Sequence, residues 1–229
     1  MLLFILGCLQ ADADLAKSEG KPVIPLYVSN VHNSADSSSV KIIIYDEEDQ
    51  SKEIGHGSSN YFRYRGHHFL LTAAHVVSEK NPLKIEDGSN LVDLQIVYID
   101  FETDIAILKP ATQLKNIEPL KWSNRKSELR LGEKIYYAGY PSHYDKVLIS
   151  GMVSSLTERG MIIQSFALPG SSGSVVFDKS GRVLGVVSAV GIGYTPVSPY
   201  PVMQEDLVFV STIAHIDNRT LIEVLECGS

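Results

Sequence analysis

The segment PGSSGSVV, residues 169–176, places Ser172 between two glycines immediately before a β-branched run. Glycines on both sides of a residue permit a tight turn that presents the intervening side chain outward. The backbone N–H groups of such a turn also face one side, where they can stabilise a developing oxyanion. A plain turn that leads into a strand fits the same residues, so this segment alone leaves two interpretations open.

Two segments nearer the N-terminus add a histidine and an aspartate. Residues 70–77 read LLTAAHVV and contain His75, whereas residues 102–108 read ETDIAIL and place Asp104 before an apolar strand. Serine is a poor nucleophile at neutral pH unless a base accepts its proton, and an imidazole oriented by a carboxylate is such a base. The three residues together therefore predict a catalytic triad. Taken singly, His75 also fits a structural histidine and Asp104 a turn residue.

The order of the three residues separates two classes of hydrolase. Here His75 and Asp104 precede Ser172, whereas an esterase on an α/β-hydrolase scaffold places its acid and histidine after the serine. The order argues against that scaffold.

The rest of the chain reads as a series of short strands. The segments are rich in β-branched and aromatic residues, are bounded by Gly, Pro, Ser or Asp, and predict an all-β protein of the barrel or sandwich type. They cover residues 40–45, 61–71, 91–99, 105–108, 134–139, 147–156, 161–166, 174–177 and 182–189. Residues 34–39 form a serine-rich loop in this interpretation, 109–124 a linker between two halves, and 213–226 a closing helix.

Composition excludes several other classes of protein. Hydrophobic residues make up 44% of the 229 residues, enough for a core, and the net charge of -7 without a dense basic run argues against nucleic-acid binding. No metal-ligand spacing surrounds His56, His67 and His68, which fit exposed strand histidines, and no cofactor motif is found. Cys8 and Cys227 define no disulfide framework and are interpreted as free thiols.

The N-terminus leaves several interpretations open. Residues 1–9 are apolar and precede the small-x-small sequence ADA at 11–13, as in a signal peptide, while ILGC at 5–8 resembles a bacterial lipoprotein box. A buried or frayed apolar arm fits equally well, because no basic residue precedes the run. The localisation is therefore either exported (periplasmic, extracellular or lipid-anchored) or cytoplasmic. No stretch is long enough for a transmembrane helix, so no integral membrane span is expected.

Taken together, these segments resemble the trypsin-like (chymotrypsin-fold) serine proteases, and within them the HtrA/Deg-like bacterial branch. The matching motifs run from about residue 55 to 189 and are TAAH at 72–75, TDIAIL at 103–108, GYP at 139–141, SGMVS at 150–154, PGSSGS at 169–174 and GRVLGV at 181–186. Two residues depart from the family pattern. Ser171 replaces the usual Asn or Asp, which argues against activation by a freed N-terminus, and Ser174 replaces the second glycine.

The resemblance implies an architecture. We expect two antiparallel six-stranded β-barrels with a C-terminal helix, within a protease domain that covers residues 21–229 and follows an apolar leader at 1–20. Barrel one is expected over about 22–112, barrel two over about 120–210, and the helix over about 213–226. No PDZ domain is expected after the helix.

The resemblance also implies a site and an activity. The expected activity is that of a serine endopeptidase acting on a protein or peptide substrate through an acyl-enzyme, with His75, Asp104 and Ser172 as the triad and Gly170, Ser171 and Ser172 as the oxyanion loop. The S1 pocket is expected between the wall Ser188-Ala189-Val190 and a floor at Phe166, although Phe166 fits a core position equally well. The alternative function is a catalytically silent binding or structural module on the same fold.

Overall fold

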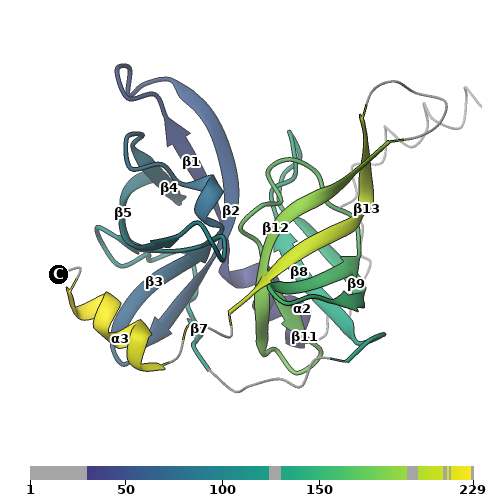
Figure 1. Ribbon diagram of the computed structural model, residues 1–229. Coiled ribbons are helices and arrows are strands. Elements are labelled where there is room, and N and C mark those ends of the chain that lie inside the picture. The colour runs from purple at the N-terminus through teal and green to yellow at the C-terminus, as the bar shows by residue number, and fades with distance from the viewer. Residues whose placement is uncertain (1–29, 124–129, 195–200, 214–215, 217, 228–229) are drawn as a thin grey trace, which may run out of the picture.

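The computed structural model describes residues 30–123, 130–194, 201–213, 216 and 218–227. Strands dominate these residues and build two barrels that lie side by side (Figure 1). The predicted leader at residues 1–20 lies outside the described residues.

Barrel one is a sheet in the order β1-β4-β5-β6-β3-β2, which the antiparallel pairing of β1 with β2 closes into a ring. A seventh strand, β7, joins parallel to β2 at the outer edge. The strands are β1 (Ser39–Tyr45), β2 (Glu53–Tyr64), β3 (His67–Thr72), β4 (Leu83–Asp87), β5 (Asn90–Asp100), β6 (Ile105–Pro110) and β7 (Leu120–Lys121).

Barrel two is a closed ring of six antiparallel strands in the order β10-β13-β12-β11-β8-β9. They are β8 (Lys134–Gly139), β9 (Val147–Leu156), β10 (Gly160–Gln164), β11 (Val175–Asp178), β12 (Val183–Tyr194) and β13 (Pro201–Thr212). Two six-stranded barrels confirm the predicted fold class. Closure pairs every strand of the two rings on both sides, which reduces the edges along which foreign strands could pair.

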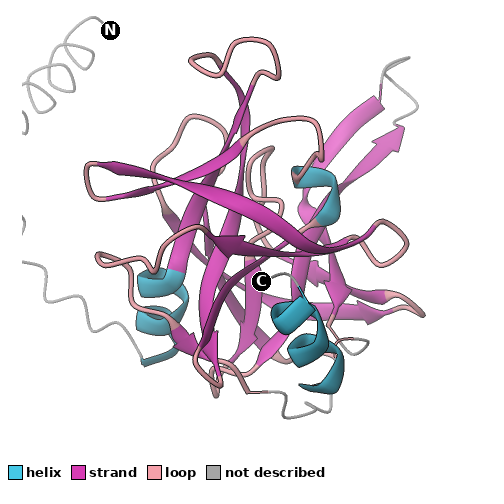
Figure 2. Cartoon of the chain, turned by 90° about the vertical axis from the view of Figure 1, so that its left-hand side faces the viewer, coloured by secondary structure: helices cyan, strands magenta, loops and turns pink. Residues whose placement is uncertain are grey.

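Both longer helices lie outside the barrels (Figure 2). Helix α3 (Asn218–Cys227) packs against β5 and buries Leu221 and Leu225, which accords with the predicted C-terminal helix. Helix α2 (Asn30–Ser38) replaces the loop expected at residues 34–39, so that expectation was wrong. None of the helices in the described ranges is long and apolar enough to cross a membrane.

The reason for helix α2 is a tertiary contact that its own sequence does not show. The amide of Asn60, on β2, donates to the carbonyl of Ala35 at 3.2 Å and to the Ser38 hydroxyl at 2.8 Å. Ser38 in turn donates to the carbonyl of Ser34 at 2.8 Å. The bond from Asn60 satisfies the carbonyl of Ala35 in the last turn of the helix, where carbonyls have no partner within the helix.

The two barrels share one core and barrel two also has its own. The first cluster of buried side chains fills barrel one and includes Val175, Phe177 and Val186 from barrel two, and the second lies within barrel two. Trp122, within the segment predicted as a linker, is buried against barrel one, with its ring 5.3 Å from that of Phe62 and edge-on to it. This shared core fixes the relative position of the barrels, and hence of any residues that face one another between them.

Candidate active site

Asp104 is presented by a tight turn between β5 and β6. The carboxylate of Asp100 accepts the backbone N–H of Glu102 at 2.9 Å and the hydroxyl of Thr103 at 2.7 Å, which closes the turn. Asp104 itself has φ of +54°, a left-handed conformation that aspartate tolerates better than most residues. The turn directs the Asp104 side chain toward the segment that carries His75.

His75 lies in a single 3₁₀ turn, η1 (Ala74–Val76), directly after β3. Its backbone N–H donates to Asp104 Oδ1 at 2.9 Å, so Asp104 caps a turn whose preceding residue, Ala73, has no capping oxygen. Its ring Nδ1 lies 3.0 Å from Oδ1 and 2.9 Å from Oδ2 of the same carboxylate. The two residues that the sequence predicted as partners are therefore held together by main chain and side chain.

Ser188 on β12 connects this pair to barrel two. The strand register shifts between Val187 and Ala189, and at this bulge the Ser188 hydroxyl donates to Asp104 Oδ2 in a short hydrogen bond. Burial alone would raise the pKa of the Asp104 carboxyl. Hydrogen bonds from His75 and Ser188 outweigh burial, and the net pKa lies below that of a free aspartate. Asp104 is thus held as an anion beside the imidazole.

The lowered pKa of Asp104 predicts a pH dependence of stability. Because the unfolded chain takes up this proton first, near the free-aspartate pKa of about 3.9, ionised Asp104 stabilises the fold above that pH. The contribution is lost as the pH falls through the folded-state pKa. We expect the difference in unfolding free energy between the native chain and Asp104→Asn to shrink between about pH 5 and pH 3. Urea titrations across this range measure it, and a constant difference would contradict the assignment.

Ser172 lies in a turn whose main chain is bonded on several sides. Its carbonyl accepts the N–H of Ser58 on β2 at 2.8 Å, and the next amide, of Gly173, donates to the carbonyl of Val187 at 2.8 Å. Gly173 has φ of +90°, and a Cβ there would come 2.0 Å from the Ser58 carbonyl oxygen. The glycine that follows the candidate nucleophile is therefore required by both its backbone conformation and the lack of space.

The segments that carry His75 and Ser172 both approach Gly57 of β2, and no hydrogen bond joins the two side chains in the part of the chain that the structure describes. A Cβ built on Gly57 would lie 2.4 Å from the side chain of Val76 and 3.3 Å from the carbonyl oxygen of Ser172. The residue that follows His75 and the candidate nucleophile thus flank the same glycine. Catalytic hydrogen bonds are often long or poorly aligned in a chain without substrate.

The segments that carry these residues match one family of proteins. The trypsin-like peptidase domain matches residues 57–186, more than half of the 229-residue chain. The chain belongs to the trypsin-like peptidase family. Serine protease HTRA1 of Xenopus laevis is 32% identical over 149 residues, which are 59% of this chain and 32% of that protein. The serine protease HtrA-like protein of Staphylococcus haemolyticus is 28% identical over 139 residues, 52% of this chain and 22% of its own length.

These matches confirm the predicted HtrA-like resemblance, and the chain spans about a third or less of the length of those two relatives. Among solved structures, the active form of the Rv3671c protease of M. tuberculosis superposes with a TM-score of 0.63. It is 22% identical, and the match covers 82% of both chains. That likeness confirms the two-barrel fold.

The turn at residues 170–173 of this trypsin-like peptidase is called the serine turn below. Its backbone N–H groups differ in whether they already donate a hydrogen bond within the protein. The N–H of Ser171 donates to the carbonyl of Leu168 at 2.9 Å, so it is occupied. The N–H groups of Gly170 and Ser172 have no such partner among the described residues, and these two are the candidate oxyanion donors. Gly170 has φ of +94°, and a Cβ on it would lie 2.4 Å from the carbonyl oxygen of Tyr140. Only glycine fits this position.

The predicted S1 residues lie on barrel two beside the serine turn. Phe166 is 43% exposed, which excludes the core position that the sequence left open for it. Ala189 is exposed and Val190 half-buried, whereas the Ser188 side chain is committed to Asp104. The sequence assigned Ser188 to the pocket wall only, whereas in the structure its hydroxyl bonds Asp104.

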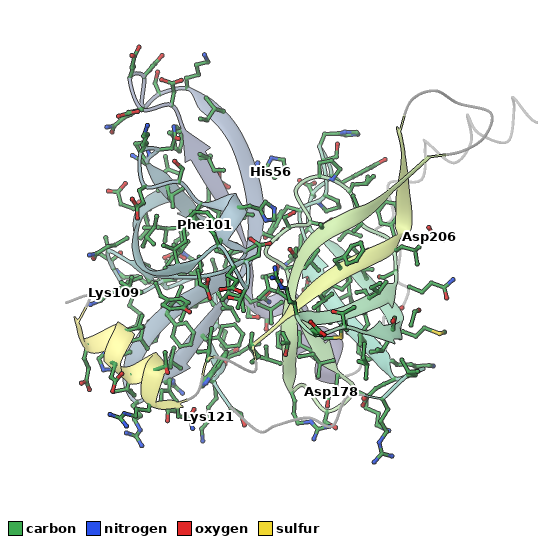
Figure 3. All side chains as sticks on the ribbon, in the orientation of Figure 1. His56, Phe101, Lys109, Lys121, Asp178 and Asp206 are labelled. Carbon is green, nitrogen blue, oxygen red and sulfur yellow. The ribbon has the colours of Figure 1, made fainter. Side chains whose placement is uncertain are left out.

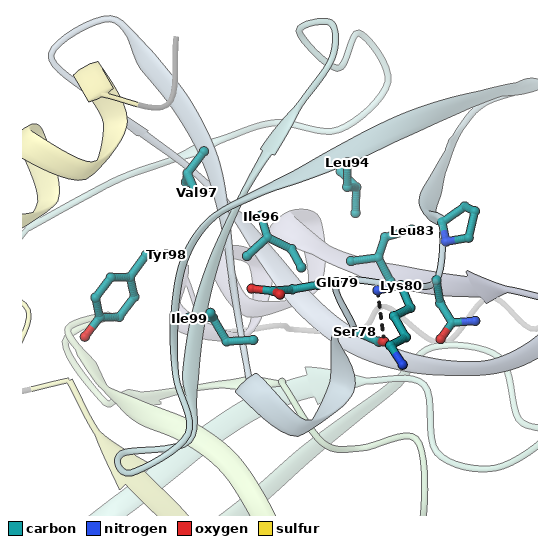
Figure 4. A pocket seen from close by; sticks show the side chains of 11 residues that line it. Ser78, Glu79, Lys80, Leu83, Leu94, Ile96, Val97, Tyr98 and Ile99 are labelled. Atoms are coloured by element: carbon teal, nitrogen blue, oxygen red, sulfur yellow. Dashed lines mark hydrogen bonds between the residues drawn. The ribbon is translucent and has the colours of Figure 1, made fainter. Parts of the chain in front are cut away.

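A cavity of about 580 Å³ lies on barrel one, between the loop Ser78–Asn81 and strand β5 (Figure 4). Apolar side chains of Leu83, Leu94 and Ile96 line its wall. None of the predicted site residues lines it, so it is separate from the candidate active site.

The prediction from the sequence did not include two residues that lie near the site. His56, interpreted as an exposed strand histidine, is half-buried and lies between the barrels, with Nε2 3.0 Å from the carbonyl oxygen of Tyr140 (Figure 3). Ser58 is fully buried at the same junction. The one available signal was the short spacing HGS at residues 56–58, which puts both side chains on one face of a strand.

Proposed function

We propose that this trypsin-like peptidase is a serine endopeptidase in which Ser172 is the nucleophile, His75 the general base and Asp104 the residue that orients the imidazole. The observation that carries the proposal is the double hydrogen bond from His75, through its main chain and its Nδ1, to one anionic carboxylate. With Nδ1 facing Asp104, the proton of a neutral imidazole resides there, and Nε2 is the nitrogen left to accept a proton.

The chemistry follows from this arrangement. As the Ser172 hydroxyl attacks the scissile carbonyl carbon, its proton passes to His75 Nε2, and the carbonyl oxygen becomes an oxyanion facing the Gly170 and Ser172 amides. The imidazolium, stabilised by Asp104, then gives the proton to the leaving amine and an acyl-enzyme forms. Water, deprotonated by the same imidazole, attacks the ester and releases the acid and Ser172.

The proposed substrates are proteins or peptides with a small or aliphatic side chain at P1. An exposed phenylalanine at the proposed floor and the small Ala189 on the wall offer no acidic partner for a lysine or arginine. A pocket of this kind discriminates by apolar contact, in which each methylene is worth roughly 1–3 kcal/mol.

Labelling with a fluorophosphonate probe tests the proposal. The native chain is expected to form one covalent adduct, mapped to Ser172 by peptide mass analysis, and Ser172→Ala is expected to form none. Ser171→Ala is the matched control, because this neighbour is buried and its hydroxyl bonds only within the turn; it should label at Ser172. A folded native chain without an adduct would support the catalytically silent module instead, and an adduct at another residue would contradict the assignment of Ser172.

A further inference from the structure

Buried Ser58 makes four hydrogen bonds that connect both barrels to the serine turn. Its N–H donates to the Ser172 carbonyl at 2.8 Å, and its own carbonyl accepts the hydroxyl of Thr72 at 2.7 Å, three residues before His75. Its hydroxyl accepts the N–H of Tyr140 at 2.9 Å and lies 2.7 Å from the carbonyl oxygen of Gly170. Because the Tyr140 amide is the donor in the first of these side-chain bonds, the single hydroxyl proton of Ser58 goes to Gly170.

His56 contacts the same loop from the same face of β2. Residues two apart on a strand share a face, and His56 Nε2 lies 3.0 Å from the carbonyl oxygen of Tyr140. A carbonyl only accepts, so Nε2 carries the proton in this contact. The Tyr140 peptide groups are thus bonded on both sides, by Ser58 through the N–H and by His56 through the carbonyl. Two residues further along, the Ser142 N–H donates to the Pro169 carbonyl at 2.5 Å.

These bonds determine where the Gly170 N–H, one of the two candidate oxyanion donors, points. In a trans peptide the carbonyl and the following N–H point in opposite directions. The Pro169 carbonyl is held by Ser142, so the N–H of Gly170 faces the other way. The Gly170 carbonyl is held by Ser58, which turns the Ser171 N–H toward the Leu168 carbonyl and away from the site. Ser58 thus holds the Gly170 carbonyl directly, and His56 and Ser58 hold Tyr140, two residues before Ser142. The Ser172 N–H is oriented within the turn itself, because the Ser171 carbonyl of the same peptide accepts the Ser174 N–H at 3.1 Å.

We infer that His56 and Ser58 are positioning residues, which clamp the loop at residues 140–142 and the Gly170 carbonyl so that the Gly170 amide faces the substrate oxyanion. The inference rests on the proposed serine endopeptidase function. The surroundings are tight, since a Cβ on Gly170 would lie 2.6 Å from His56 Nε2 and one on Gly139 2.9 Å from Ser58 Oγ. The clamp therefore has little space in which to rearrange around a lost bond.

Loss of the clamp is expected to affect the transition state more than substrate binding. Removal of an entire oxyanion donor costs about 10²–10³ in kcat. A donor that is still present but no longer held costs less, so we expect Ser58→Ala to lower kcat about 10- to 100-fold with KM little changed. The probe is p-nitrophenyl butyrate, an ester of a short aliphatic acid. Ser59→Ala is the matched control, since Ser59 is also fully buried but its hydroxyl donates to Val40, in barrel one, at 3.2 Å.

A pair of inhibitors separates positioning from a general loss of stability. A short peptide ending in valine aldehyde forms a hemiacetal with Ser172 that places an oxygen at the oxyanion site, whereas the corresponding alcohol does not. Ser58→Ala should weaken the binding of the aldehyde by the same factor by which it lowers kcat/KM. The binding of the alcohol should stay unchanged. If Ser58→Ala and Ser59→Ala have equal kcat, the clamp is refuted. It is also refuted if Ser58→Ala loses affinity for the aldehyde and for the alcohol by the same factor.

Half-buried His56 supplies a second test that does not depend on the folding of Ser58→Ala. His56→Ala should lower kcat in the same direction, and His56→Gln, whose amide can donate to the Tyr140 carbonyl, should recover most of it. Equal losses in both variants would overturn the role of His56. If the native chain neither hydrolyses the ester nor labels at Ser172, the proposed function itself fails, which is distinct from an active native chain that tolerates Ser58→Ala.

Discussion

Replacement of His75 by alanine is expected to reduce kcat on p-nitrophenyl butyrate by about 10⁶-fold. Without the imidazole, no group beside Ser172 accepts the hydroxyl proton, and a neutral serine is a weak nucleophile. The double variant His75→Ala/Ser172→Ala should be about as slow as either single variant, because base and nucleophile act as a unit. Steady-state rates at equal concentrations of folded protein measure this.

Comparison of the loss of kcat in the double variant with the losses in the two single variants shows whether the two residues cooperate. This comparison is important because His75 and Ser172 form no hydrogen bond in the structure. His143→Ala is the matched control: His143 is exposed in a loop, where it stacks on Tyr144, and its removal should leave the rate unchanged. If the losses in the double variant multiplied, His75 and Ser172 would act in separate steps and the proposed pair would not exist.

The strands could be predicted because their signal is local. β-branched runs between turn residues mark strands such as β1 and β6, and the alternation of residues 91–99 marks β5. Helix α2 could not be predicted in this way. It depends on Asn60, more than 20 positions further along the chain, whose amide bonds the Ala35 carbonyl and Ser38. Local composition favoured a loop there, and the tertiary contact outweighed it.

In the candidate site, too, residues with a local sequence signal could be predicted and tertiary contacts could not. The three residues stand out by their local sequence: His75 follows two alanines, Asp104 precedes an apolar strand and Ser172 lies between two glycines. The first two are indeed paired. Their catalytic roles stay predictions. The contact of Ser188 with Asp104 depends on a register shift in β12, and those of Ser58 depend on two loops more than 80 residues away. Small polar residues in strands are common, so neither contact leaves a distinctive pattern in the sequence.

The second large effect concerns Asp104→Asn, which we expect to lower kcat about 10⁴-fold while the fold is retained. The asparagine oxygen can still accept from the His75 N–H or from Ser188, which preserves the turn. The amide NH₂, however, donates to Nδ1, and this moves the imidazole proton to Nε2. In that tautomer Nε2 cannot accept the Ser172 proton, and the imidazolium that forms during reaction has no anion beside it.

A matched control distinguishes loss of the orienting role of Asp104 from a general loss of stability. Asp87 is a buried carboxylate of barrel one, and it accepts the N–H groups of Lys115 and Asn116 at 2.7 Å each. Asp87→Asn should lower the melting temperature, because the bonds to an anion are lost, yet keep kcat close to the native value. Rates and thermal melts of the two variants are compared side by side. If Asp87→Asn and Asp104→Asn lose activity in proportion to their loss of stability, Asp104 orients nothing, and the ionised partner of His75 is a structural feature of the turn alone.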